Sequence, residues 1–84
     1  MKVKIVAVSD THLQHNFDVP DGDIFIHAGD LSSAGTESEW LRASAWIRGL
    51  PHRYKIVVPG NHDWFAERRP GLARAMLGDA VMLL

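Results

Sequence analysis

Cysteine is absent from the 84 residues, and the formal net charge is only −1. Without cysteine there are no disulfides and no thiolate metal sites, so any metal must be held by oxygen and imidazole groups. The near-neutral charge lacks the basic excess that nucleic-acid binding normally leaves in a composition. We therefore expect a protein of the reducing cytoplasm, with no strong nucleic-acid signal.

Long apolar runs and glycine-rich phosphate loops are also missing. The apolar run at residues 3–8 stops at Ser9 and Asp10, too early for a signal peptide, and no window reaches the roughly 18 apolar residues that span a bilayer. Neither Gly-x-Gly-x-x-Gly nor Gly-x-Ser-x-Gly occurs. We expect no membrane partner, no nucleotide cradle and no nucleophile elbow.

What remains is the composition of one small globular domain, with 46% hydrophobic and 23% charged residues. Apolar runs predict strands at residues 2–9, 23–27 and 54–58. Thr36 and Glu39 have the spacing of a capping box, so a helix is predicted to begin near Glu37 and to end before Pro51. This strand, helix, strand order predicts a parallel α/β sheet with a crossover helix.

The last third of the chain predicts a second helix over residues 64–77, interrupted at Pro70 and Gly71. Residues 80–84 are apolar and strand-like, and such a run would present an unpaired sheet edge to water. We therefore expect a shortened chain, with self-association or a second chain at this apolar edge.

The polar residues that carry chemistry each follow a predicted strand. Asp10 and His12 follow the first strand, Asp30 follows the second, and residues 61–63 follow the third. The carboxyl ends of parallel strands meet at one edge of a sheet, where ligands bind. We expect the side chains of Asp10, His12, Asp30 and Asn61 to meet there.

Two carboxylates at this edge favour a cation. At about 4 Å they repel by roughly 4 kcal/mol at an effective dielectric of 20, so bringing Asp10 and Asp30 together requires positive charge between them. Carboxylate, imidazole and amide ligands suit Mn, Fe, Zn or Mg ions, and one carboxylate such as Asp30 can bridge two ions.

These blocks carry a family resemblance. Asp10-Thr11-His12, Gly29-Asp30 and Gly60-Asn61-His62-Asp63 resemble the first three motif blocks of the calcineurin-like metallophosphoesterases. The sequences of residues 9–13, 19–23 and 26–31 resemble in particular the metallophosphoesterase domain-containing, phosphodiesterase-like branch of this family. The resemblance implies the N-terminal portion of a four-layer α/β/β/α sandwich, so residues 1–84 form a single partial domain.

The resemblance also implies roles for individual residues. Asp10 and His12 would hold the first metal, Asp30 would bridge both metals, and Asn61 would bind the second. His62 would protonate the leaving oxygen or steady the phosphate, and Asp63 would orient His62. The family's later Gly-His and Gly-His-x-His blocks are absent, since no histidine follows His62.

Two functions stay open. The first is metal-dependent hydrolysis of phosphoesters, with phosphodiesters favoured, by a metal-bound hydroxide at a dinuclear site and with weak activity in the isolated chain. The alternative is a non-catalytic remnant that binds one metal ion or a phosphate and acts by association. The native metal, the substrate and the oligomeric state do not follow from the sequence.

Several residues have simpler explanations. His27 falls within or at the end of a strand, where a hydrogen-bonded core histidine, or one that supports a metal ligand, is expected in preference to a ligand. His15 and His52 are expected to be exposed, and a makeshift ligand role is the alternative for His15. Arg68 and Arg69 fit a solvated helix face better than a phosphate site.

Overall fold

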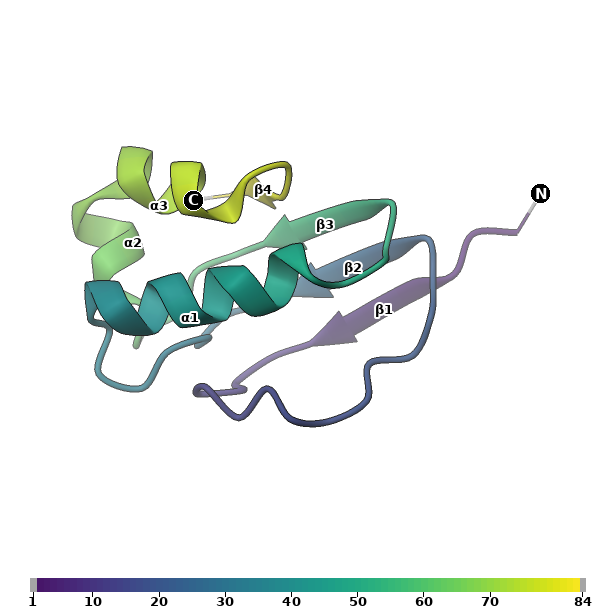
Figure 1. The fold of residues 1–84 in the computed structure, drawn as a ribbon, viewed down its shortest axis with the longest axis horizontal. Coiled ribbons are helices and arrows are strands. Elements are labelled where there is room, and N and C mark those ends of the chain that lie inside the picture. The colour runs from purple at the N-terminus through teal and green to yellow at the C-terminus, as the bar shows by residue number, and fades with distance from the viewer. Residues whose placement is uncertain (1, 84) are drawn as a thin grey trace.

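The computed structural model describes residues 2–83, which contain four strands and three helices joined by loops (Figure 1). In chain order they are β1 (Ile5–Val8), β2 (Ile24–His27), α1 (Glu37–Arg48), β3 (Tyr54–Val57), α2 (Trp64–Arg68), α3 (Pro70–Leu77) and β4 (Val81–Met82). The predicted strand over residues 80–84 is confirmed in part as β4, and Leu84 lies outside the described residues. No helix in the described range is both long and apolar enough to cross a bilayer.

The strands form one parallel sheet in the order β1-β2-β3-β4. Residues aligned across the sheet include Ile5, Ile24 and Tyr54 in one row, and Ala7, Ile26 and Ile56 in another. The predicted parallel pairing of the second and third strands, with a helix crossing between them, is confirmed.

Both ends of α1 are stabilised by side chains. Thr36 Oγ1 accepts a hydrogen bond from Glu39 N at 3.3 Å, as a capping residue should. Glu39 does not complete the box at Thr36; its carboxylate instead accepts from Ser33 N and Ala34 N, each at 2.8 Å. At the other end, Lys55 Nζ donates to three backbone carbonyls, which suits the negative end of the helix dipole.

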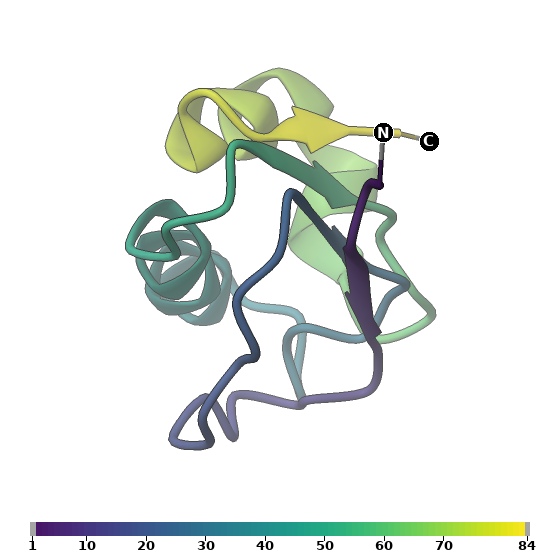
Figure 2. The ribbon, with the colours of Figure 1, turned by 90° about the vertical axis from the view of Figure 1, so that its right-hand side faces the viewer.

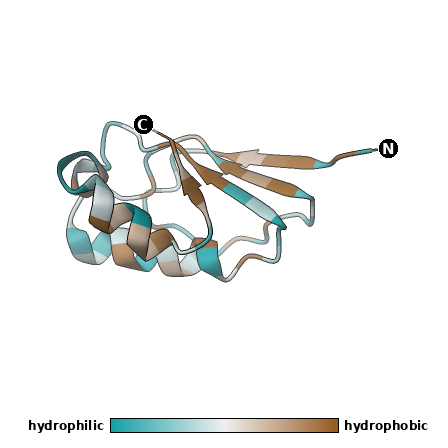
Figure 3. Cartoon of the chain, turned by 90° about the horizontal axis from the view of Figure 1, so that it is seen from above, coloured by the Kyte–Doolittle hydropathy of each residue, from teal (hydrophilic) through white to brown (hydrophobic). Residues whose placement is uncertain are grey.

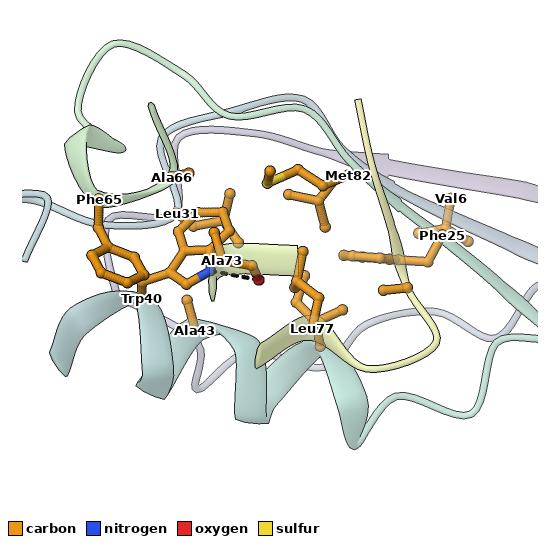
Figure 4. Close-up of a cluster of buried hydrophobic side chains, with 13 residues drawn as sticks. Val6, Phe25, Leu31, Trp40, Ala43, Phe65, Ala66, Ala73, Leu77 and Met82 are labelled. Atoms are coloured by element: carbon orange, nitrogen blue, oxygen red, sulfur yellow. Dashed lines mark hydrogen bonds between the residues drawn. The ribbon is translucent and has the colours of Figure 1, made fainter. Parts of the chain in front are cut away.

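The core lies between the sheet and the helices (Figure 4). Phe25 of β2 and Val57 of β3 are fully buried in one cluster with Trp40 of α1 and Leu77 of α3. Trp40 Nε1 donates to Ala73 O at 3.2 Å, so the indole is both packed and hydrogen-bonded. This contact ties α1 to α3 and helps fix the helical layer over the sheet.

Pro70 divides the predicted second helix into two. Arg69, with φ −130°, joins α2 to α3, and Pro70 is the first residue of α3. Proline is well placed there because its missing N–H would have had no partner in the first helical turn. The predicted interruption is confirmed, and it separates two short helices.

One face of the sheet is not covered by the described residues. The helices pack on the face that carries Phe25 (Figure 2), whereas Ile5, Tyr54 and Val81 on the other face are 58%, 54% and 52% exposed. The strands are hydrophobic along much of their length (Figure 3). Residues 2–83 therefore cover one face of the sheet only, because all three helices pack on the same side.

Two histidine predictions also need correction. His52 is 4% exposed instead of solvent-exposed, and its Nε2 lies 2.9 Å from Pro20 O. His15 is half-buried and stacks on Trp46 with ring centroids 4.0 Å apart. Both burials depend on tertiary neighbours that are distant in sequence.

Candidate metal centre

The loops after β1, β2 and β3 meet at the carboxyl edge of the sheet, toward which the three arrows point in Figure 1. Backbone hydrogen bonds join the first two loops: Asp10 N donates to Gly29 O at 2.8 Å, and His12 N donates to Asp30 O at 3.0 Å. Motif residues from separate strands are thus brought to one place.

The turn after β1 has an unusual backbone. Asp10, His12 and Leu13 have φ angles of 56°, 45° and 68°, and Asp30 in the next loop has 59°. L-residues other than glycine rarely adopt these left-handed angles, and such strain clusters at functional sites. The two loops therefore hold their side chains in a conformation that local preferences do not favour.

His12 presents one ring nitrogen to the centre. Its Nδ1 lies 3.0 Å from Ser32 O, and because a carbonyl only accepts, Nδ1 carries the proton in the neutral ring. Nε2 therefore keeps its lone pair, and it lies 3.9 Å from Asp10 Oδ1 and 4.0 Å from Asp30 Oδ2. These separations are too long for hydrogen bonds, so His12 Nε2 is not paired with either carboxylate.

Asp30 stands between the two site histidines. Its Oδ2 is 3.3 Å from His62 Nδ1, and its Oδ1 accepts from His62 N at 2.8 Å. Ligand atoms of His12, Asp30 and His62 all lie within 4.8 Å of one another. The predicted ligands His12 and Asp30 are thus together, and His62, predicted as catalytic, lies beside them.

Hydrogen bonding keeps Asp30 ionised. The His62 backbone N–H, more than any other group, lowers the pKa of Asp30 below its ordinary value. Partial burial opposes that shift, and the His62 side chain adds to it. An ionised carboxylate flanked by imidazoles is the form that binds a divalent cation.

Asp10 and Asn61 lie at the margin of this group. Asp10 is exposed, and its Oδ1 lies 3.9 Å from His12 Nε2. Asn61 is also exposed, and no hydrogen bond of its side chain occurs among the described residues. Their assignment as metal ligands stays a prediction.

Asp63 is placed differently from the role expected of it. It is 1% exposed, and its carboxylate accepts from Ser32 N, Ser32 Oγ, Gly60 N and Leu31 N. No hydrogen bond joins this carboxylate to the His62 ring among residues 2–83. Asp63 therefore joins the second and third loops, and its predicted action on His62 would run through the position of that loop.

The donor set fits a divalent cation, and the third loop approaches it closely. The centre offers carboxylate oxygens and an imidazole lone pair without sulfur, which suits Mn, Fe, Zn or Mg ions. Gly60 is needed for the close approach: a Cβ there would meet Asp30 Oδ1 and lie 2.5 Å from Asp30 N. The third loop can support the Asp30 carboxylate only because this residue has no side chain.

Sequence reasoning assigned no role to Thr11 or Ser32, although both lie in or beside the motif blocks. Ser32 Oγ is 3.0 Å from His62 O and 2.6 Å from Asp63 Oδ1, and Ser32 O orients His12. Thr11 Oγ1 bonds two histidines. A hydroxyl residue within the first block and another shortly after the second were the available signals.

Comparison with known proteins identifies the class that this fold and site define. The model of the calcineurin-like phosphoesterase family matches residues 3–79. The chain therefore belongs to this metal-dependent family, and its parallel α/β sheet agrees with the N-terminal part of the metallophosphoesterase fold.

Individual relatives are similar over most of this chain. Metallophosphoesterase domain-containing protein 1 of Homo sapiens is 44% identical over 61 residues, which is 71% of this chain and 19% of that protein. A UPF0046 protein of Caenorhabditis elegans is 39% identical over 98% of this chain and 30% of its own length. The probable rhamnogalacturonate lyase C of Emericella nidulans is 52% identical over 79% of this chain and 6% of that protein. The chain thus spans less than a third of each of these relatives.

Proposed function

We propose that this chain carries part of the catalytic centre for metal-dependent hydrolysis of phosphoesters, with phosphodiesters as the substrate class. The observation that carries the proposal is the meeting of His12, Asp30 and His62 from three loops, with ligand atoms within 4.8 Å. Membership of the phosphoesterase family supports the reaction type.

His12 and Asp30 would hold the cation, His12 through its Nε2 lone pair and Asp30 through Oδ2. When bound, divalent cations neutralise charge on phosphoryl oxygens and lower the pKa of water. Asp10 and Asn61 would complete the ligand set from the margin of the site, and Asp30 would be the carboxylate shared by two ions.

His62 would act on the leaving oxygen. Its side chain is 53% exposed, and Nδ1 faces Asp30 Oδ2 at 3.3 Å. With Nδ1–H donated to this carboxylate, the imidazolium form of the ring would give its Nε2 proton to the leaving oxygen. Asp63 and Ser32 would keep the His62 loop in place.

The proposal extends to the cation and the compartment. Mn²⁺ is the cation we would test first, because oxygen and imidazole ligands suit it. The absence of cysteine fits a reducing cytoplasm. A second chain, or a second copy of this one, would bind at the exposed apolar residues Val81 and Leu83.

The test is Mn²⁺ titration of the purified chain by calorimetry, with hydrolysis of bis-p-nitrophenyl phosphate followed in parallel. We expect binding and slow turnover in the wild type, and loss of both in Asp30→Asn. Asp21→Asn changes an exposed carboxylate outside the site and serves as the matched control. A wild type that binds Mn²⁺ no better than Asp30→Asn would refute the proposal.

His62→Ala distinguishes a catalytic His62 from a metal ligand, because its ring nitrogen lies among the atoms that could hold an ion. A variant that binds Mn²⁺ normally but does not hydrolyse the ester would support a catalytic role, as proton donor or as the residue that steadies the phosphate. Loss of binding would make it a ligand. Binding without turnover in the wild type would favour the alternative function, a non-catalytic module that holds an ion.

A further inference from the structure

Three side chains outside the metal-ligand group form a hydrogen-bonded chain under the first loop. His27, fully buried at the end of β2, has Nε2 2.8 Å from Thr11 Oγ1. The same hydroxyl lies 2.8 Å from His15 Nε2. On the other side of His27, Gly29 N approaches Nδ1 at 3.2 Å.

The backbone determines which atom donates in each of these hydrogen bonds. Gly29 N–H can only donate, so His27 Nδ1 must accept and the proton of the neutral ring is on Nε2. His27 therefore donates to Thr11 Oγ1, which leaves the Thr11 hydroxyl proton for His15 Nε2. In that arrangement His15 carries its own proton on Nδ1.

The surroundings keep both rings neutral. Burial lowers the pKa of His27 to about 4, and the charge of Asp63 only partly offsets it. Burial also lowers the pKa of His15, with help from Arg42. The direction of the hydrogen bonds and the neutral state of the rings therefore agree.

The hydrogen-bonded series His27, Thr11 and His15 is important because of where Thr11 lies. Its neighbours Asp10 and His12 have φ angles of 56° and 45°. Thr11 is 9% exposed, whereas Asp10 is exposed and His12 is half-buried, so Thr11 is the residue of this motif that reaches the interior. A turn with an unfavourable backbone needs such an anchor to stay in one conformation.

We propose that His27 is a positioning residue, which as an Nε2–H donor anchors Thr11 and thereby holds Asp10 and His12 in the geometry that binds metal. The metal-binding part rests on the proposed function. His27 otherwise stands in a row with Val8, Val57 and Met82, where an apolar side chain would pack equally well. Packing alone therefore does not account for a histidine at this position.

Long-range ¹H–¹⁵N correlation spectra of the labelled chain at neutral pH test the proton arrangement. We expect the Nε2–H tautomer for His27 and the Nδ1–H tautomer for His15. Thr11→Val should let His15 relax to a tautomer mixture while His27, still fixed by Gly29, keeps its own. A His27 ring that carries its proton on Nδ1, or on both nitrogens, would overturn the proposal.

Paired variants test the positioning role. His27→Gln keeps an N–H donor, and His27→Leu removes it while suiting the apolar row. We expect Mn²⁺ affinity to fall about 10- to 100-fold in His27→Leu, the range for lost partners of metal ligands, and within about 3-fold of wild type in His27→Gln. His52→Leu removes another buried, hydrogen-bonded histidine and should leave the affinity unchanged.

The urea midpoint separates positioning from stability. Positioning predicts a loss of affinity in His27→Leu without a matching loss of stability, whereas a purely structural role moves both together. Equal affinities of the leucine variant and wild type, or of the two variants, would refute the idea. If the wild type binds no Mn²⁺, the proposed function fails, and amide shifts of Asp10 and His12 decide instead: they must move in His27→Leu and stay in His27→Gln.

Discussion

Replacing Asp63 with asparagine tests how the loops of the site are held together. The carboxylate is buried and accepts four hydrogen bonds, two at each oxygen. An amide of the same shape keeps one accepting oxygen and turns the other into a donor. One pair of donors, either from Ser32 or from Leu31 and Gly60, then loses its acceptor and faces an N–H group.

The expected loss of stability follows from those two bonds. Hydrogen bonds to charged groups contribute about 1.5–3 kcal/mol each, so Asp63→Asn should lower the free energy of unfolding by about 3 kcal/mol or more. A chain of this size has about 4–13 kcal/mol in total. The melting temperature should fall by about 12 °C or more, at about 4–8 °C per kcal/mol.

Urea unfolding followed by tryptophan fluorescence, to which buried Trp40 contributes, measures this loss. Asp21→Asn, at an exposed aspartate, is the control and should change the free energy by no more than about 0.5 kcal/mol. If Asp63→Asn stays within about 1 kcal/mol of wild type while hydrolysis drops, Asp63 acts on His62 directly and the loop-joining role is wrong.

Three further outcomes follow from buried or crowded groups. The free energy of unfolding should fall by about 2–3 kcal/mol between pH 6.5 and pH 4, because burial lowers the pKa of His27 to about 4 while the unfolded ring takes up its proton near 6.5. Urea titrations should show a smaller fall in His27→Gln, and equal falls would contradict this reasoning. Ser44→Ala should raise the free energy of unfolding by about 1 kcal/mol, since Ser44 Oγ is buried without a partner among the described residues; a decrease would show that the hydroxyl is satisfied. Gly60→Ala should weaken Mn²⁺ binding about 10-fold or more by displacing Asp30, as measured by calorimetry against Gly71→Ala, where the new methyl group meets open space. Equal affinities would mean that the loop adjusts.

Much of the fold could be predicted because its signals are local. The apolar runs place β1, β2 and β3 to within a few residues, and Thr36 gives the start of α1. Coverage of the sheet depends on where whole helices pack, and the strand sequences did not carry that information. His52 was missed for a similar reason, because its partner Pro20 O lies 32 residues away.

The site was predictable in position and less so in detail. Residues that follow parallel strands must meet at one edge, and His12 and Asp30 do so. The direction in which Asp63 points could not be read from the sequence, since it depends on N–H groups of another loop becoming available. The left-handed backbone at Asp10 and His12 was also invisible, because neither is glycine.

The uncovered face of the sheet affects which probes can report on this protein. Dyes such as ANS fluoresce on exposed apolar surface and are commonly read as markers of loosened packing. Rows of side chains that include Ile5, Tyr54 and Val81 offer such a surface in the fully folded chain. A bright dye signal at room temperature would therefore be a property of the native state, and indole emission is the safer measure of its melting.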